Sequence, residues 1–251
     1  MARQDRAAPT AAVGPEMAAD ATQPTGPATS LLDPRVVQIM STEHWSLLSA
    51  RTLAYNEAFT RGGMFLSFLS MSFVALALLA QVMSLEAGLG VVAIVVLGFD
   101  VVVGLTTYGR IIRANYEDYL AVRGMARIRH AYGEIAPVVL PYFVSSTHDD
   151  LRGVMVSYGS PPPGGRGSLI YALTTSSGMV GLIVSMLTGG LGLIVALVAG
   201  LPMILAAVLG VAAGLAMFGS LVFLSVRYFA DIQNRLSVMF PSPPEDADKL
   251  L

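Results

Sequence analysis

The sequence predicts an all-α membrane protein with four transmembrane helices arranged as two hairpins, the first of which extends into a cytoplasmic antiparallel helical stalk. Three observations predict this fold class. Only 13% of the 251 residues are charged, about half the share typical of a soluble domain, and the mean hydropathy is +0.66. The chain contains three long apolar tracts, and a helix needs about 20 residues to cross a bilayer. The basic residues fall in segments that can all lie on one side of that bilayer.

The first hairpin and its extensions occupy residues 34–136. We expect its transmembrane helices at 64–83 and 89–108, because each of these apolar tracts suits a single span. The segment before the first span has no internal proline, and the segment after the second continues as a helix until Pro137, which ends it. At about 1.5 Å per residue, each extension reaches roughly 40 Å beyond the membrane. The two extensions are therefore expected to pack together as the stalk.

The distribution of basic residues predicts that both termini are cytoplasmic. Of the fifteen Arg and Lys residues, five precede the first span, seven separate the second span from the last apolar tract, and three follow that tract. Cytoplasmic loops carry the excess of basic residues, so the last tract must cross the membrane an even number of times. We expect spans at 177–199 and 202–226, with Gly200 ending one helix and Pro202 opening the next. Ser176 and Ser177 are available to cap the third span.

Three further segments flank the spans. Residues 1–33 are rich in Ala, Pro and Thr and contain no apolar run long enough for a signal peptide, so we expect a disordered tail that is not cleaved for export. Residues 137–176 are expected to form a cytoplasmic loop whose VVLPYFV stretch lies at the bilayer surface, with Tyr142 as one of its aromatic anchors. Residues 227–251 are expected to form a cytoplasmic C-terminal helix and tail.

The stretch from Arg129 to Asp150 brings two of the three histidines close to carboxylates. The candidate metal ligands in it are His130, Glu134, His148, Asp149 and Asp150. Imidazole and carboxylate groups can bind zinc or iron, but their spacing here matches no specific metal motif. The alternative is a polar joint in which Thr147 begins a T-x-x-D capping box and the acids complement the start of a short helix. We favour the joint, and we predict no metal and no cofactor.

Asp100 lies at the centre of the second predicted span, in the sequence LGFDVVVG. An ionisable residue inside a membrane is by default a candidate functional site, here for a proton or a cation. The alternative is a structural role, in which the carboxyl group forms hydrogen bonds with hydroxyl groups of neighbouring helices. The hydroxyl groups considered for this role are those of Ser67, Ser70, Ser185 and Thr188. With no relay of further ionisable residues, the structural role is favoured.

Small residues recur at four-residue spacing in the last two predicted spans. The third span carries Ser177, Gly181, Ser185 and Gly189, and the fourth carries Ala206, Gly210 and Gly214. Such faces allow helices to approach closely in lipid. We expect them to pack the third span against the fourth within one chain, in preference to joining two chains.

The antiparallel stalk also predicts specific ion pairs between its two helices. Placing the helices level at the membrane brings Glu57 near Arg113, and Arg51 near Glu117 or Asp118. Farther from the membrane, the same register brings Glu43 near Arg127 or Arg129. Exposed pairs contribute only about 0.2–1 kcal/mol each, so they would set the register while apolar burial supplies most of the cohesion.

Two stretches resemble an uncharacterised family of four-span bacterial membrane proteins found mainly in actinobacteria. They are AYNEAFTRGGMFLSFLSMSFVAL, residues 54–76, and GMARIRHAYGEIAPVVLPYFVSSTHDD, residues 124–150. The resemblance covers residues 40–230 and implies a four-span topology. It implies no activity, because none is assigned to that family.

The leading functional prediction is a non-enzymatic scaffold in the bacterial plasma membrane, whose stalk binds a cytoplasmic protein or a second copy of the chain. The alternatives are a small ion or proton channel or transporter subunit that uses Asp100, and a membrane metalloprotein. Nucleic acid is excluded as a partner, because acidic residues interrupt the basic residues of the stalk. The only partner that the sequence requires is the lipid bilayer.

Overall fold

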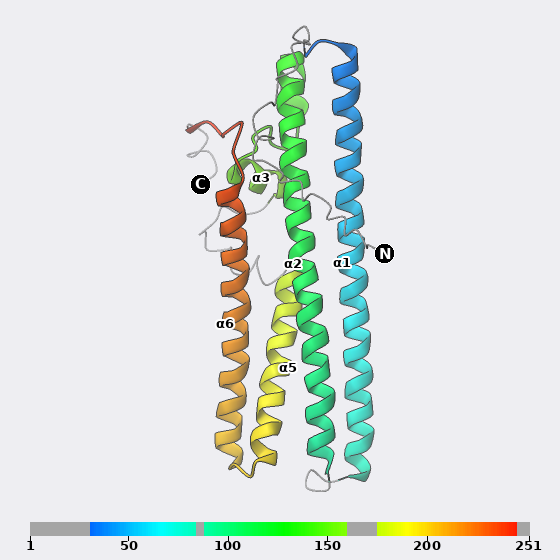
Figure 1. Cartoon of the computed structure of the whole chain (residues 1–251), viewed down its shortest axis with the longest axis vertical. Coiled ribbons are helices and arrows are strands. Elements are labelled where there is room, and N and C mark those ends of the chain that lie inside the picture. The colour runs from blue at the N-terminus through cyan, green and yellow to red at the C-terminus, as the bar shows by residue number, and fades with distance from the viewer. Residues whose placement is uncertain (1–30, 84–87, 160–174, 245–251) are drawn as a thin grey trace, which may run out of the picture.

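The computed structural model describes residues 31–83, 88–159 and 175–244, and every regular element in these ranges is helical. The four long helices are α1 (Pro34–Val82), α2 (Gly90–Ile135), α5 (Ser176–Val198) and α6 (Met203–Arg235). A 3-10 helix, η2 (Pro137–Tyr142), and a short helix, α3 (Leu151–Tyr158), follow the end of α2 (Figure 1). Each long helix is long and apolar enough to cross a membrane. The all-α fold class with four such helices is therefore confirmed, whereas most of the predicted disordered tail 1–33 lies outside the described residues.

The helices α1 and α2 each run without interruption through an apolar stretch and far beyond it. Asp33 caps α1 by accepting a hydrogen bond from the backbone N–H of Arg35, and Pro34 occupies the first turn, where its missing N–H costs nothing. The helix has 49 residues and α2 has 46, so each is roughly 70 Å long. The two helices lie side by side along most of this length (Figure 1).

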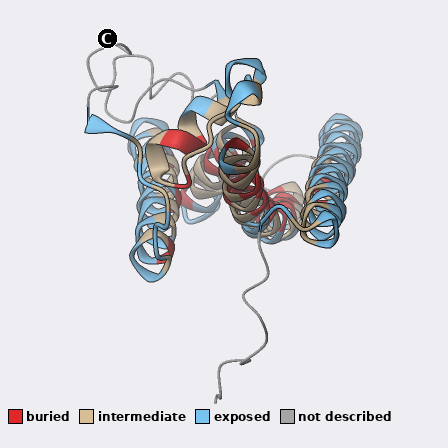
Figure 2. Ribbon diagram, turned by 90° about the horizontal axis from the view of Figure 1, so that it is seen from above, coloured by how far each residue is buried: buried red, intermediate tan, exposed pale blue. Residues whose placement is uncertain are grey.

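The four long helices form a row in the order α1, α2, α5, α6. Each helix packs against its neighbour in this order, while α1 touches α5 only marginally. Seen from above, the buried residues gather on the middle helices and the outer helices are mostly exposed (Figure 2). Three helices of the row meet at Gly104 of α2, where an added Cβ would lie 2.5 Å from the Val184 side chain of α5 and 3.0 Å from the Phe65 ring of α1. Only glycine lets all three helices meet there.

The small residues of α5 serve two different contacts. Gly189 faces Gly210 and Gly214 of α6, where an added Cβ on any of the three would come within 3.0 Å of the facing backbone. Nearer the start of α5, Ser177 accepts a hydrogen bond from Asn115, and Gly181 packs against the Tyr108 ring of α2. These contacts all join helices of the same chain. Each four-residue step along α5 rotates the position of the small residue by about 40° around the helix, so the first ones face α2 and the last ones face α6.

Two local details of α5 differ from or refine the sequence expectation. The residue that caps α5 is Thr175, whose hydroxyl accepts from the Gly178 N–H, and not Ser176 or Ser177, which lie inside the helix. Gly200 adopts the left-handed conformation after α5, with φ of 79°, and Pro202 precedes the first residue of α6. The turn between the last two helices thus follows from local backbone preferences.

The stretch VVLPYFV does not lie beside the apolar part of the molecule. It forms most of η2 and the two residues after it, at the end of α2 remote from the apolar stretch (Figure 1). Ala136, where α2 ends, is 28 residues beyond Tyr108, which corresponds to roughly 40 Å of helix. The continuous helix α2 therefore separates this stretch from the apolar part of the first hairpin, and its position at the bilayer surface stays a prediction that this separation does not favour.

Candidate functional site

The most elaborate polar site lies in the head of the molecule, which we define as the last turns of α2, η2, residues 143–150, α3 and residues 236–244. Sequence features fold the chain back on itself here. Pro137 cannot continue α2, and η2 returns so closely that a Cβ on Gly133 would lie 2.6 Å from Leu140. Asp150 then caps α3, because its carboxylate accepts from the Gly153 N–H at 2.8 Å. Gly159, with φ of 62°, ends that helix.

Asp149 is the centre of the site and is 0% exposed. Its Oδ2 accepts from Arg127 Nε at 2.7 Å and lies 3.3 Å from Arg123 Nη2. Its Oδ1 accepts from the backbone N–H groups of Phe240 at 2.8 Å and Met239 at 3.0 Å. Burial alone would raise the pKa of this carboxyl group, but the Phe240, Arg127 and Met239 hydrogen bonds hold it below its ordinary value.

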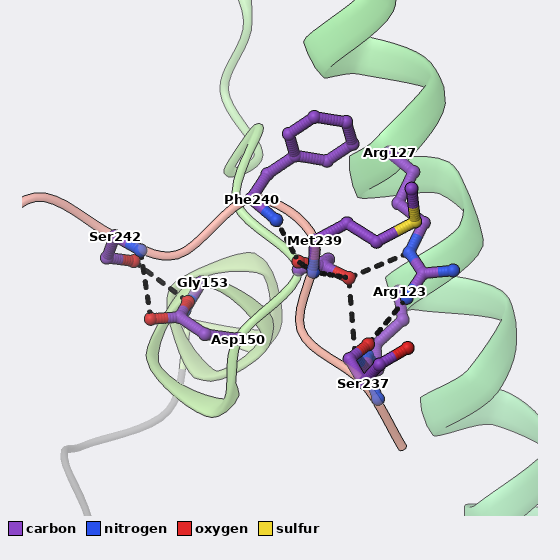
Figure 3. Close-up of polar contacts among 9 residues, drawn as sticks. Arg123, Arg127, Asp150, Gly153, Ser237, Met239, Phe240 and Ser242 are labelled. Carbon is purple, nitrogen blue, oxygen red and sulfur yellow. Dashed lines mark hydrogen bonds and ion pairs between the residues drawn. The ribbon is translucent and has the colours of Figure 1, made fainter.

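The neighbouring carboxylate and both arginines complete the attachment of the C-terminal segment. Asp150 accepts from the Ser242 N–H at 3.1 Å and from its hydroxyl at 2.8 Å. Both arginines also donate to the Ser237 carbonyl oxygen at 2.8 Å (Figure 3). We call this set the clasp: Arg123, Arg127, Asp149, Asp150 and residues 237–242. It joins α2 to the segment that follows α6, over more than 100 residues of sequence.

The Asp149 carboxylate at the centre of the clasp is fully occupied by protein groups. The two arginines of the clasp both pair with Asp149, and Asp150 balances the second positive charge, so the formal charges of the clasp cancel. Both Asp149 oxygens already accept hydrogen bonds from protein groups. A nucleophile or general base needs an oxygen that can reach a substrate. The arrangement instead resembles a buried ion-pair network that specifies how two parts of the chain meet.

The predicted metal-ligand candidates are close together but are used otherwise. His130 stacks on the Phe240 ring with centroids 3.9 Å apart, and its Nε2 lies 3.7 Å from Glu134. The His130 and His148 rings are 6.3 Å apart. Within the described part of the chain, no group of three or more His, Cys, Asp or Glu side chains could hold a metal ion.

The capping residue of the joint differs from the expectation. Thr147 does not cap α3, because the helix starts at Leu151, four residues later, and Asp150 supplies the cap. The hydroxyl that serves the preceding turn is that of Ser146, which accepts from the His148 N–H at 3.0 Å. The sequence pattern predicts a capped helix start, but the cap lies three residues later than predicted.

A cavity of about 520 Å³ adjoins the clasp. Apolar side chains form one part of it, while Arg152, His148 and the hydroxyl groups of residues 145–147 form the rest. The side chain of Val144 at its rim is 98% exposed, and Val138 and Tyr142 nearby in sequence are also exposed. This end of the head therefore combines a hollow with apolar side chains in contact with solvent.

Asp100 lies in the apolar part of the row and is 1% exposed. Its Oδ1 accepts from the Ser72 hydroxyl of α1 at 3.0 Å, and its Oδ2 is buried without a hydrogen-bond partner. An apolar cavity of about 280 Å³ one turn away is lined by Leu97 but not by Asp100. The Asp100 side chain is therefore enclosed by protein atoms and does not border this cavity.

The hydroxyl groups that the sequence suggested as partners of Asp100 are engaged elsewhere. Each of them donates to a carbonyl oxygen four residues earlier in its own helix; they belong to Ser67, Ser70, Ser185 and Thr188. The sequence does not identify Ser72 as the partner. Which side chain of one helix meets a side chain of the next depends on how each helix is rotated about its axis, and sequence spacing does not define this rotation.

One of the three predicted stalk ion pairs is present. Arg51 pairs with Asp118, which also accepts from Tyr158 at 2.6 Å and Tyr55 at 3.1 Å. Burial, followed by the nearby Asp118 carboxylate, raises the pKa of Tyr158. This tyrosine of α3 was not anticipated, because its approach to α2 follows from the reversal of the chain in the head.

The other two predicted pairs are wrong. Glu57 binds Arg110 and not Arg113, with an Nε to Oε1 distance of 2.9 Å. Hydrogen bonds from Arg110 and then Arg61 lower the pKa of Glu57 to about 2. Of the two arginines predicted for Glu43, Arg127 pairs with Asp149 and Arg129 donates to the Ser146 carbonyl oxygen, and no ion pair of Glu43 occurs among the described residues. The register of α1 and α2 thus agrees with the expected one to within one helical turn. The reach of each side chain decides which residue of that turn forms the ion pair.

Comparisons with family models, curated proteins and solved structures found no match to this chain. The resemblance of residues 54–76 and 124–150 to a four-span bacterial family therefore stays a prediction. The function has to be argued from the geometry alone.

Proposed function

We propose that the chain is a multi-pass scaffold of the bacterial plasma membrane that holds an interaction surface in the cytoplasm at a fixed distance from the bilayer. Four helices have the length and hydropathy for this placement. The basic residues would then all lie on the cytoplasmic side, together with both termini and the head. The head would stand roughly 40 Å from the membrane surface, at the end of the continuous helix α2.

The observation that carries this proposal is the clasp. It joins the far end of α2 to the segment after α6, so the head is tied to helices at two points. A buried ion pair contributes little net stability over an apolar core, but it specifies one geometry. A scaffold needs such a defined geometry, whereas both oxygens of Asp149 are occupied and neither is available to a substrate.

The surface that would meet the partner is the cavity beside the clasp with its exposed apolar rim. Apolar side chains exposed to water around a hollow are typical of sites that bind another protein. Val144 and Tyr142 would enter a complementary apolar site, and Arg152 together with the hydroxyl groups of the cavity would form the polar margin. The expected partner is a cytoplasmic protein that presents an apolar side chain.

The test uses a photoreactive amino acid at Val144, with Glu134 as the control position on the same end of the molecule. We expect the Val144 probe to form an adduct with one cytoplasmic protein that, when tagged in turn, retrieves this chain. The Glu134 probe, which is exposed but lies outside the cavity, should not form this adduct. Adducts to lipid alone at Val144 would contradict the proposal, because they would place the head at the membrane.

Topology is tested separately with reporter fusions. Fusions after Gly88 and Gly200 should read as extracytoplasmic, and a fusion after Leu251 should read as cytoplasmic. A C-terminus outside the cell would contradict the division of the apolar tracts into two hairpins.

A small ion or proton channel subunit is the second candidate, and the free Oδ2 of Asp100 is the observation that favours it. A buried polar atom without a partner is costly and rare, so it can mark a functional group. Proton or cation flux in vesicles containing the purified protein, lost in Asp100→Asn, would support this function. The absence of flux above that of empty vesicles would remove it.

A further inference from the structure

The outer face of α1 is an uncharged seam along the edge of the row. This face, which we call the α1 seam, is made of the positions reached from Gln38 by alternating steps of four and three residues as far as Ser70. Every one of these ten positions is exposed in the structure, and none carries a charge. The charged side chains nearby are directed elsewhere: Arg51 and Glu57 bind residues of α2, and Arg61 donates to Glu57.

The seam has the spacing of a coiled-coil contact. Positions chosen by steps of four and three stay on one face of a helix that supercoils with a partner, so one partner helix can contact the whole seam. Most side chains of the seam are small or polar, and three are large and apolar: Trp45, Phe59 and Leu66. Trp45 and Phe59 are 65% and 66% exposed although they precede the apolar stretch, and Ser49 and Gly63 lie between or beside them. Leu48 and Leu53, on either side of the seam between them, are 37% and 70% exposed, so the apolar side chains form a patch and not a single exposed residue.

Hydroxyl groups of the seam donate their hydrogen bonds to carbonyl oxygens of α1 itself. Thr42 donates to the Gln38 carbonyl oxygen at 2.9 Å, and Ser49 donates to the Trp45 carbonyl oxygen at 2.8 Å. Ser70 donates in the same way to Leu66 at 2.8 Å. Because these donors are satisfied within the helix, another surface can cover them without a loss of hydrogen bonds. A Cβ on Gly63 would meet nothing within 4 Å, so a second helix can approach the backbone there.

We propose that the α1 seam pairs in parallel with the same seam of a second copy of this chain, about an axis along the membrane normal. The seam passes from the aqueous part of α1 into its apolar part without interruption, so its occupant must be a helix that does the same. Lipid would cover only the apolar part, and a soluble protein only the remainder. A second α1, inserted in the same direction, fits both parts. This step rests on the membrane placement proposed above.

The absence of charge fits a second copy in particular. A two-fold contact places each residue opposite its own counterpart, so any charged residue at the centre would meet a like charge. The seam avoids this from Gln38 to Ser70. The helix is also the outermost of the row, so the approach of a second copy requires no rearrangement of α2, α5 or α6 (Figure 2).

The test uses single cysteines in this cysteine-free chain. Ser49→Cys and Asn56→Cys lie on the seam, and Ala50→Cys is an exposed control that lies off it. Under mild oxidation in native membranes, we expect the two seam variants to give a disulfide-linked homodimer several-fold more abundantly than the control. Adding Thr52→Lys, an exposed seam substitution, should abolish the difference, because it places two like charges at the contact.

Equal crosslinking of Ser49→Cys and Ala50→Cys would overturn the proposal, and so would a crosslink to a different protein. Labelling of Ser49→Cys with a membrane-impermeant maleimide from either side separates this failure from that of the membrane topology. Dimerisation with the cysteine facing the cytoplasm supports both proposals. Dimerisation with the cysteine outside the cell overturns the topology but leaves the seam contact standing.

Discussion

Two buried carboxylates, Asp149 in the head and Asp100 in the apolar part of the row, occupy opposite environments. Asp149 accepts hydrogen bonds from two backbone N–H groups and lies within 3.3 Å of two guanidinium groups. Asp100 accepts from one hydroxyl group and leaves its other oxygen without a partner. An ionised carboxylate in an apolar interior costs far more than one neutral hydrogen bond recovers.

The tertiary structure depends more on Asp149 than on Asp100. Asp149 joins segments that are far apart in sequence, so its removal would leave charges and backbone groups unpaired in the head. Asp100 joins only α1 to α2, which are already packed together along their length. We therefore expect substitutions at the two sites to differ strongly in their effect on the free energy of unfolding.

The largest effect is expected for Asp149→Ala. It leaves the buried Arg123 side chain and the Met239 and Phe240 N–H groups without their acceptor, and breaking a buried ion pair costs about 3–5 kcal/mol. The measurement is the free energy of unfolding of the full chain in detergent. Asp231→Asn is the control, because its pair with Arg235 lies on the surface and is expected to contribute almost nothing. Equal stability of the two variants would mean that the clasp does not hold the head together.

Acidification should release the clasp in the wild-type protein. The pKa values of Asp149 and Asp150 lie below their ordinary values in the folded state. Their contribution to stability is therefore complete above the unfolded value of about 4 and is lost as the pH falls below it, through the folded pKa values. The protection of residues 237–242 against amide exchange, taken relative to the intrinsic exchange rate at each pH, should fall steeply in this range. Exchange that is already fast at neutral pH would contradict the attachment.

An intermediate effect is expected for Asp150→Ala. The substitution removes the cap of α3 and the acceptor for both Ser242 groups, and loss of a helix cap costs about 1 kcal/mol. Unfolding measured alongside Asp149→Ala should rank the two. A serine at the same position, which can still cap the helix, should recover part of the loss.

The smallest effect is expected for Asp100→Asn. One interhelical hydrogen bond in a membrane contributes about 0.6 kcal/mol, and an amide can still accept from Ser72. Ser72→Ala should cost a similar amount, and the double variant should cost no more than either alone. A large loss of stability would show that Asp100 has a partner comparable to those of Asp149, which would reverse the comparison.

The long helices and several of their ends could be predicted from the sequence, because they arise from local properties of the chain. Apolar runs of about 20 residues identify the four long helices, and Pro137, Gly200 and Pro202 end or begin helices through their own backbone restrictions. The Arg51–Asp118 pair could also be predicted, because a short connection between two helices sets their register to within a turn.

The contacts between helices and the place where the head folds back could not be predicted from the sequence, because they depend on tertiary packing. The backbone N–H groups that bind Asp149 lie about 90 positions later, and the hydroxyl bound to Asp100 belongs to Ser72 because of how α1 is rotated. Periodicity shows which residues share a face but not which neighbour that face meets, since this depends on packing summed over the whole row. For the same reason Glu57 pairs with Arg110 instead of Arg113, and the VVLPYFV stretch lies at the far end of α2, remote from the apolar stretch.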